Sequence, residues 1–246
     1  MGTFLTDIPH PDSFSTFTYW YARANVNVWV DAGSPTSGNW KIIIDPGITI
    51  TSVDPSLPAL KTSTLQNWPG WLWIVNNGDI RGAGGNGGTG LAQTAGKGGA
   101  THNSPGGGGA GLTFGLKGET DNGIQAVNGT ATAGGAGGLG STLTAHDHPP
   151  IGAEPGGHAI SVRDFNVIIE NYGTIWGGGG GGAFADGNAY YGGAGGDPGE
   201  PGHRDALGYV PAGNAGYAVY MEGPAIIGSY AFRGNTGSAD IKGPLS

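Results

Sequence analysis

The residues best suited to metal binding are His146 and His148, in the run His146-Asp147-His148-Pro149-Pro150. Alternate residues of an extended strand share one face, so the two imidazoles could point the same way. Imidazole is a ligand for zinc, iron and nickel. The alternative is a solvated loop that ends at the two prolines. We favour the loop, and we predict neither a metal site nor a cofactor.

Sequence motifs of enzymes give little support for catalysis. The phosphate-binding pattern G-x-G-x-x-G, which occurs at 82–87, is uninformative in a chain with 54 glycines among 246 residues, and no helix follows it. Carboxylates such as Asp197 and Glu200 could serve a glycosidase, which needs two carboxyl groups about 5–10 Å apart, but nothing in the sequence fixes that distance. The nucleophile pattern G-x-S-x-G is absent. We therefore predict that the protein is not an enzyme.

A third group of residues suits the recognition of another macromolecule. Tyr190 and Tyr191 stand among glycine, asparagine and aspartate. Tyrosine offers a large contact area for few frozen torsions, together with a hydroxyl group, and it is common in binding surfaces for that reason. The alternative is that these tyrosines cap one end of a folded bundle.

The composition predicts that the elements that position these residues gain order by a route other than an ordinary apolar core. Glycine is far above its average share of about 7%, and charged residues make up 11% of the chain against about 25% in ordinary domains. Aromatic residues remain frequent, which argues against disorder. The net charge of −8 argues against a nucleic-acid partner. No apolar run is long enough to predict a membrane span.

The first 80 residues have the pattern of β-structure. Val26, Val28 and Val30 alternate with other residues, which is the period of a half-buried strand. The apolar run 42–44 stops at Asp45-Pro46-Gly47, a strong turn signal. No helical pattern with caps is present. We predict an all-β N-terminal module with essentially no α-helix.

Glycine dominates the remainder, with five glycines in residues 1–77 and 49 in residues 78–246. Flexible linkers are one interpretation of such runs. The structured alternative is the polyproline II geometry, whose backbone N–H and C=O groups point outward and need partners. Helices without side chains can lie close enough to pair through these groups. Because several glycine runs alternate with short apolar strands, we predict a bundle of polyglycine II helices.

An internal repeat links the two kinds of structure. The segments 74–82 and 169–177, which start 95 residues apart, both match I-x-N-x-G-x-I-x-G and both lead into glycine. A degraded third copy spans 226–234, with Phe232 at its second apolar position. The repeating unit is a short strand, a turn and a glycine run.

This unit resembles the receptor-recognition adhesins at the ends of bacteriophage tail fibres, of the T-even distal type, and the glycine-rich tips of lambda-like central fibres. The resemblance covers about residues 74–234 and depends on Asn76-x-Gly78, Asn171-x-Gly173 and the run 177–182. It implies a layered polyglycine bundle whose loops at one end contact a bacterial outer-membrane protein or polysaccharide. It also implies that the N-terminal part attaches to another phage tail protein, and that the chain belongs to the virion and acts outside the cell.

On this resemblance, residues 1–80 form a β-rich attachment domain and residues 81–246 a glycine-rich receptor-binding domain. Recognition is expected in the segments 141–155 and 184–211, which interrupt the glycine. The candidate receptor-binding residues are His146, His148, Asp186, Asn188, Tyr190, Tyr191, His203, Arg204 and Tyr209.

Two other functions remain open from the sequence. The first is a structural tail-tip or baseplate component stiffened by the bundle. The second is an ice-binding protein, which the absence of cysteines and the separate β-module disfavour. Attachment as a monomer and as a homotrimer are both compatible with the sequence.

Overall fold

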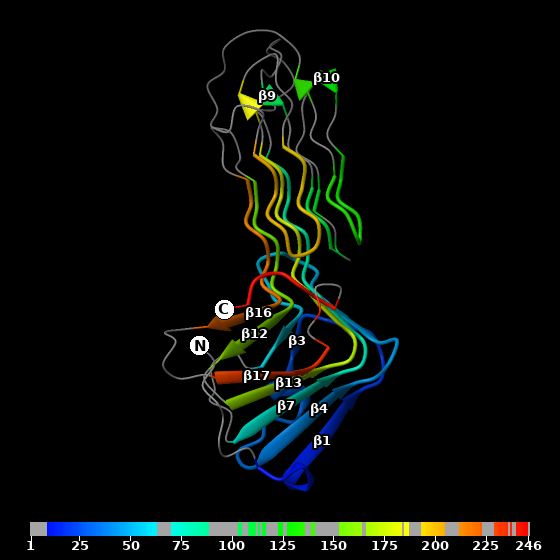
Figure 1. Ribbon diagram of the computed structural model, residues 1–246, viewed down its shortest axis with the longest axis vertical. Coiled ribbons are helices and arrows are strands. Elements are labelled where there is room, and N and C mark those ends of the chain that lie inside the picture. Colours follow the sequence, from blue (N-terminus) through cyan, green and yellow to red (C-terminus); the bar gives the residue numbers. More distant parts are fainter. Residues whose placement is uncertain are drawn as a thin grey trace.

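The fold is almost entirely β-structure and extended glycine-rich chain. A computed structural model describes residues 9–62, 70–88, 103–104, 108–111, 113, 115–116, 123–124, 127–135, 139–140, 153–163, 166–183, 185–186, 193–204, 212–222, 229–235, 237 and 240–245. Figure 1 shows a broad β-structure and a narrow bundle that projects from it. The predicted all-β class is confirmed, because the helical elements of the described chain are the short turns η1 (Pro11–Ser13) and α1 (Val28–Asp31).

The broad part consists of three parallel sheets, which the chain visits in turn. The first sheet contains, in spatial order, β1 (Phe14–Tyr19), β4 (Asn39–Ile44), β7 (Trp71–Asn76), β13 (Asn166–Asn171) and β17 (Ser229–Gly234). The second contains β2 (Arg23–Ala24), β5 (Thr49–Thr51), β8 (Asp79–Arg81), β14 (Thr174–Trp176) and β18 (Ile241–Lys242). The third contains β3 (Val26–Asn27), β6 (Leu60–Lys61), β12 (Ile160–Arg163) and β16 (Val219–Glu222).

One strand from each sheet makes a rung, so this part is a three-sided parallel β-solenoid. Rung one holds β1, β2 and β3, and rung two holds β4, β5 and β6. Rung three holds β7, β8 and β12, and rung four holds β13, β14 and β16. Rung five holds β17 and β18, and its third side is a single bridge between Leu245 and Val219.

Apolar side chains at paired positions stack into ladders inside the solenoid. Ile42, Ile74 and Ile169 occupy one register position of the first sheet, and all three are fully buried. In the second sheet the ladder passes from Ile80 to Ile175. Burial of each such side chain contributes about 1.5–3 kcal/mol. A shift by one residue would turn the ladder outward, so burial also fixes the register.

Two buried asparagines form the corner between the first and second sheets. Asn76 Nδ2 donates to Asn171 Oδ1 at 2.8 Å and to the Thr174 carbonyl at 3.1 Å. Asn76 Oδ1 accepts the N–H of Gly78 at 3.2 Å. A Cβ on Gly173 would lie 1.8 Å from the Gly78 carbonyl oxygen, so glycine is needed there. The Asn-x-Gly element of the repeat is therefore a corner of the solenoid.

The three valines that we expected on one strand are divided between a strand and a helical turn. β3 ends at Asn27, and α1 begins at Val28. Val28 is fully buried against the core, whereas Val30 is 59% exposed. No rung precedes rung one in the described chain, and the residues that follow β3 form local hydrogen bonds such as Ala32 N–H to the Val28 carbonyl. α1 thereby covers the end of the core.

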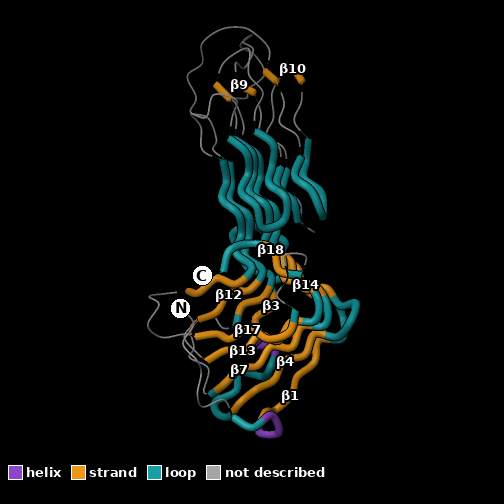
Figure 2. Tube along the Cα trace, in the orientation of Figure 1, coloured by secondary structure: helices purple, strands orange, loops and turns teal. Residues whose placement is uncertain are grey.

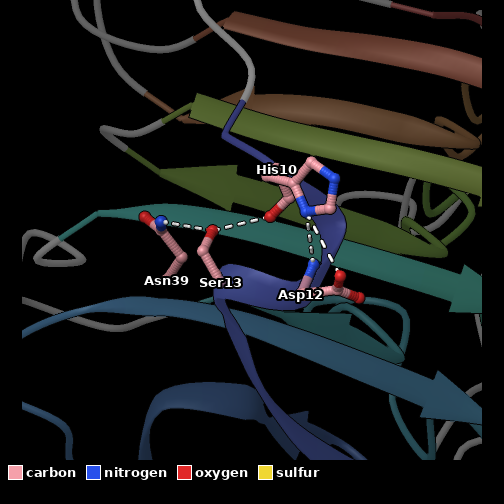
Figure 3. A network of polar contacts seen from close by, with 4 residues as sticks. All are labelled: His10, Asp12, Ser13 and Asn39. Carbon is pink, nitrogen blue, oxygen red and sulfur yellow. Dashed lines mark hydrogen bonds and ion pairs between the residues drawn. The ribbon is translucent and has the colours of Figure 1, made fainter.

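The turn η1 and Asn39, the first residue of β4, are joined by a network of polar contacts (Figure 3). The hydroxyl of Ser13 donates to the His10 carbonyl at 2.7 Å, and the N–H of Asp12 donates to His10 Nδ1 at 3.4 Å. Asn39 Nδ2 donates to Ser13 Oγ at 3.5 Å, while Asn39 Oδ1 accepts the N–H of Trp71 at 2.9 Å. Asn39 lies in rung two, and its side-chain amide thus links this rung to rungs one and three.

The glycine-rich chain leaves and re-enters at one corner of the solenoid (Figure 2). In rung three, residues 82–159 separate β8 from β12, and in rung four, residues 177–218 separate β14 from β16. In rung two the same corner is crossed by the short segment 52–59. The bundle therefore consists of two long excursions from adjacent rungs.

The internal repeat corresponds to successive rungs of the solenoid. Ile74 pairs with Ile169, which confirms that the first two copies are equivalent. The third copy is offset from the predicted alignment, because Phe232 rather than Ile226 takes the position of Ile169, and Ile241 takes the second apolar position. The corner between β17 and β18 spans 235–240 and is longer than the corner at 172–173, which displaces the pattern.

The predicted boundary at residue 80 marks where the first glycine excursion begins, but the strands do not follow it. β7, β13 and β17 lie side by side in one sheet, although the first precedes the boundary and the other two follow it. The segments 14–81 and 160–242 thus build a single solenoid. Contiguous boundaries failed here because a corner of a rung accepts a long insertion without loss of strand pairing.

Candidate functional site

The bundle is built from extended segments that run side by side. They are 82–88, 108–111, 113–116, 127–130, 133–135, 153–157, 177–183, 193–197, 200–204 and 212–216. Backbone hydrogen bonds between two neighbouring segments recur at every third residue. The N–H groups of Gly82, Gly85 and Gly88 donate to the carbonyls of Trp176, Gly179 and Gly182, respectively, each at 2.9 Å. Three residues per turn is the period of a polyproline II backbone.

Segment 177–183 lies at the centre and bonds to six others. Its N–H groups donate to carbonyls of 108–111, 153–157 and 200–204. Its carbonyls accept N–H groups from 82–88, 193–197 and 212–216. Because three residues complete a turn, donors and acceptors project in six directions around the axis. Neighbouring backbones can therefore satisfy the polar groups of an interior segment without any side chain.

Glycine is required in this segment because a Cβ would meet the neighbouring backbone. At each position of 177–182, an added Cβ would lie 1.8–2.0 Å from a carbonyl oxygen of another segment, where ordinary contact begins at 3.4 Å. The Cα atoms themselves approach these oxygens closely. Contacts of the Cα–H···O type contribute about 0.5–1 kcal/mol each.

The end of the bundle remote from the solenoid carries two small antiparallel pairs (Figure 1). β9 (Asn103–Ser104) pairs with β15 (Ala185–Asp186), and β10 (Gly123–Ile124) pairs with β11 (Leu139–Gly140). The backbone of the predicted binding residue Asp186 therefore lies at this far end. The predicted segment 141–155 begins directly after β11.

Two further predicted binding residues lie on an outer segment of the bundle. His203 and Arg204 are exposed on 200–204. The backbone of His203 bonds to Ala183 and Ala194, and both of those residues belong to segments that continue toward the far end. Six predicted residues lie outside the described part of the chain: His146, His148, Asn188, Tyr190, Tyr191 and Tyr209. Their grouping with Asp186 stays a prediction.

The opposite end of the molecule has an exposed surface that the sequence analysis missed. We call it the rung-one face and define it by Trp20, Tyr21 and Val30 beside the outer edges of β1, β2 and β3. These strands are the last in their sheets, so no further strand pairs with them in the described chain. Trp20 is 71% exposed, and its ring meets that of Tyr21 edge to face at 4.9 Å. Three consecutive aromatics at 19–21 were the available signal, because alternate strand residues face opposite sides.

A polar network fixes the side chains behind this face. The hydroxyl of Tyr19 donates to Asp31 Oδ2 at 2.9 Å, and the Arg23 guanidinium pairs with the same oxygen at 3.1 Å. Burial, and then the adjacent Asp31 carboxylate, raise the pKa of Tyr19 far above its ordinary value. The guanidinium of Arg23 also lies 5.5 Å from the ring centre of Tyr21. The exposed aromatics therefore stand on an ordered base.

Where the bundle re-enters the solenoid, an aromatic cluster joins two returning segments. The N–H of Tyr217 donates to His158 Nδ1 at 3.0 Å, so the neutral ring carries its proton on Nε2. The imidazole stacks on Tyr220 with ring centres 4.3 Å apart. Burial lowers the pKa of His158 below its ordinary value, and the charge of Glu222 partly opposes this shift.

Within the described residues, no group of three or more histidine, aspartate or glutamate side chains is placed to hold a metal ion. That part of the chain also contains no helix long and apolar enough to cross a membrane.

Comparison with known proteins relates the second half of the chain to phage adhesins. Residues 133–242 match the family model of the phage tail fibre adhesin Gp38. The chain is also similar to a solved structure, the gp37-gp38 adhesin tip complex of the bacteriophage S16 long tail fibre, with 17% sequence identity and a TM-score of 0.45 over 95% of this chain and 82% of that chain. The search of curated proteins found no match.

The region matched by the Gp38 model contains the second glycine excursion and rungs four and five. The match agrees with the resemblance predicted from the sequence, because residues 133–242 are similar to the phage tail fibre adhesin Gp38.

Proposed function

We propose that this protein is a phage tail-fibre adhesin of the virion, and that it binds an outer-membrane protein or a polysaccharide of the bacterial surface through the far end of its bundle, without catalysis. The observation that carries the proposal is the path of the chain. Two excursions leave adjacent rungs, run outward as glycine segments and form β9–β15 and β10–β11 at the remote end. The segments that follow β11 and β15 therefore begin at the end of the bundle remote from the solenoid.

In this proposal the glycine segments are polyglycine II helices that serve as a rigid platform. The three-residue period of the hydrogen bonds and the six bonded neighbours of 177–183 support this interpretation. Ordering glycine costs more conformational entropy than ordering any other residue, so a dense set of contacts is needed to hold it. A platform that is already ordered lowers the entropy lost when its loops bind a receptor.

Recognition is assigned to the nine residues predicted from the sequence. Tyr190 and Tyr191 are the expected anchors, since tyrosine provides contact area at low entropic cost. Asp186 is supported by its place in β15, and His203 and Arg204 by their exposure on segment 200–204. His146, His148, Asn188 and Tyr209 would supply hydrogen bonds and charge around the anchors.

The test replaces Tyr190 and Tyr191 with alanine in the assembled virion and measures the adsorption rate constant on host cells. We expect a loss of tenfold or more, the effect of removing about 1.4 kcal/mol of binding free energy. Tyr172→Ala is the matched control, because Tyr172 is 53% exposed at a corner of the solenoid and should not affect adsorption. Unchanged adsorption of intact virions carrying the double variant would favour the structural tail-tip function instead.

We also propose that the rung-one face attaches the adhesin to another phage tail protein. Its support is the combination of open strand edges with exposed Trp20, Tyr21 and Val30. An open strand edge presents unpaired N–H and C=O groups that can pair with another chain. Aromatic residues are also enriched at protein interfaces. The mass of the purified assembly would distinguish one copy of the adhesin from three.

A further inference from the structure

One flank of the bundle carries a groove that the proposed function does not use. It lies between segments 82–88 and 113–116 and the loop 53–57, which crosses the same corner of the solenoid in rung two. The cavity has a volume of about 520 Å³ and is lined by Val53, Asp54, Gly84, Asn86, Thr113 and Leu116, with Pro55 at its base. A smaller cavity of about 190 Å³ shares Asp54 and Pro55 and extends to Glu154.

The groove occupies a position where the described part of the bundle has no neighbouring segment. In the described chain, segment 82–88 bonds to four segments, whereas the central segment bonds to six. The N–H groups of Gly84 and Gly87 donate to Thr113 and Leu116 at 2.8 Å. The carbonyls of Gly84 and Gly87 accept no backbone N–H from any described residue. Gly84 and Gly87 are three residues apart, which is one turn, so their carbonyls have the same direction. Gly84 lines the groove.

The walls of the groove are apolar, and its charge is negative. Val53 is 59% exposed and Leu116 is 56% exposed, so the walls present uncovered hydrocarbon. Asp54 Oδ1 accepts the N–H of Ser56 at 2.7 Å, and hydrogen bonds from Ser56 lower the pKa of Asp54, so the carboxylate is charged at neutral pH. Glu154 adds a second carboxylate in the adjoining cavity. No lysine or arginine is among the residues that line either cavity.

We propose that this groove binds an extended, positively charged peptide segment of a partner protein. The backbone N–H groups of such a segment complement the carbonyls of Gly84 and Gly87, as a further segment of the bundle would. Its lysine or arginine side chains complement Asp54 and Glu154, and its apolar atoms cover Val53 and Leu116. Complementary charge gives such a site specificity and a faster association rate.

The test uses a fluorescein-labelled nine-residue peptide with the repeat Arg-Gly-Pro, which is basic and extended and has a backbone N–H at every third position for the carbonyls of Gly84 and Gly87. Fluorescence anisotropy measures its binding to the full chain at physiological salt, with a peptide in which glutamate replaces arginine as the control. Val53→Arg places a like charge in the groove and should weaken binding at least tenfold. Val127→Arg is the matched variant, because Val127 is also exposed, at 53%, and lines neither cavity. It should bind the peptide as the unchanged protein does.

Asp54→Asn provides a second variant at an exposed side chain. It should also weaken binding and reduce its dependence on salt concentration. The proposal is overturned if the unchanged protein does not bind the arginine peptide, or if it binds the glutamate peptide equally well. It is also overturned if Val53→Arg and Asp54→Asn both retain full affinity, or if Val127→Arg loses as much affinity as Val53→Arg.

Discussion

A single methyl group at the centre of the bundle should measurably destabilise the protein. Gly179 lies in the segment with six bonded neighbours. In Gly179→Ala the new Cβ would be placed 2.0 Å from the Gly196 carbonyl oxygen and 2.7 Å from that of Asp197, both of them backbone atoms. The neighbouring segment 193–197 must move away, and it cannot do so without disturbing its own hydrogen bonds.

The magnitude follows from three contributions. Overpacking of a close-packed interior costs about 1–3 kcal/mol. Residue 179 donates its N–H to Ala110 and accepts the N–H of Gly85, and distortion of each hydrogen bond costs about 0.5–1.5 kcal/mol. Alanine also lowers the conformational entropy of the unfolded chain, which stabilises the folded state by about 0.4–1 kcal/mol. The net loss in free energy of unfolding is about 3 kcal/mol, equivalent to a decrease in Tm of about 6–12 °C for a chain of this length.

Thermal unfolding followed by circular dichroism, with amide hydrogen exchange of the bundle, measures this loss. Gly237→Ala is the matched control, because the nearest atom to its Cβ is the mobile Asp240 carboxylate at 3.3 Å. Its stability should change by less than about 0.5 kcal/mol. Equal melting temperatures for Gly179→Ala and the unchanged protein would refute the backbone packing on which the platform depends.

Three further outcomes follow from the solenoid and its ends. Burial lowers the pKa of His158 below 6.5. The stability due to its neutral ring is therefore complete above pH 6.5 and is lost as the pH falls through the folded-state pKa. The free energy of unfolding should be lower at pH 5 than at pH 8, and His158→Gln should reduce this difference. Asn76→Ala leaves buried groups of Asn171 and Gly78 without partners, and urea unfolding should report a loss of about 3 kcal/mol. Trp20→Ser should weaken co-purification with the proposed tail-protein partner and leave Tm unchanged, and unaltered co-purification would contradict attachment through the rung-one face.

The side-by-side packing of the glycine segments could be predicted, because the signal for it is contained in short stretches of consecutive residues. Six consecutive glycines at 177–182 have no other structural use that the surrounding strands would support, and a three-residue period follows from the backbone alone. The strand 42–44 and its turn at 45–47 could also be predicted from the sequence. In the structure Gly47 adopts φ +77° at the corner, a conformation that favours glycine. In both places the signal and the structure occupy the same few residues.

The solenoid was not predictable from those local signals. Its pairings join residues that are far apart in sequence, as where Trp71 lies beside Asn166, and a single sequence carries no mark of such a register. The 95-residue repeat contained the information, but the glycine runs that separate its copies favoured an interpretation as two domains. The groove was equally hidden, because Asp54 and Leu116 meet only after two rungs have stacked.

The architecture separates stability from recognition. Inside the bundle, backbone groups bond to other backbone groups, so its interior tolerates few side chains and depends on none. Both excursions begin and end at stacked rungs, so each returning segment is held at the solenoid whatever residues form its remote turn. On the proposed function, substitutions in those turns should therefore alter receptor contacts at little cost to the free energy of unfolding. A protein built in this way can change the residues of its remote turns while the glycine segments that carry them remain the same.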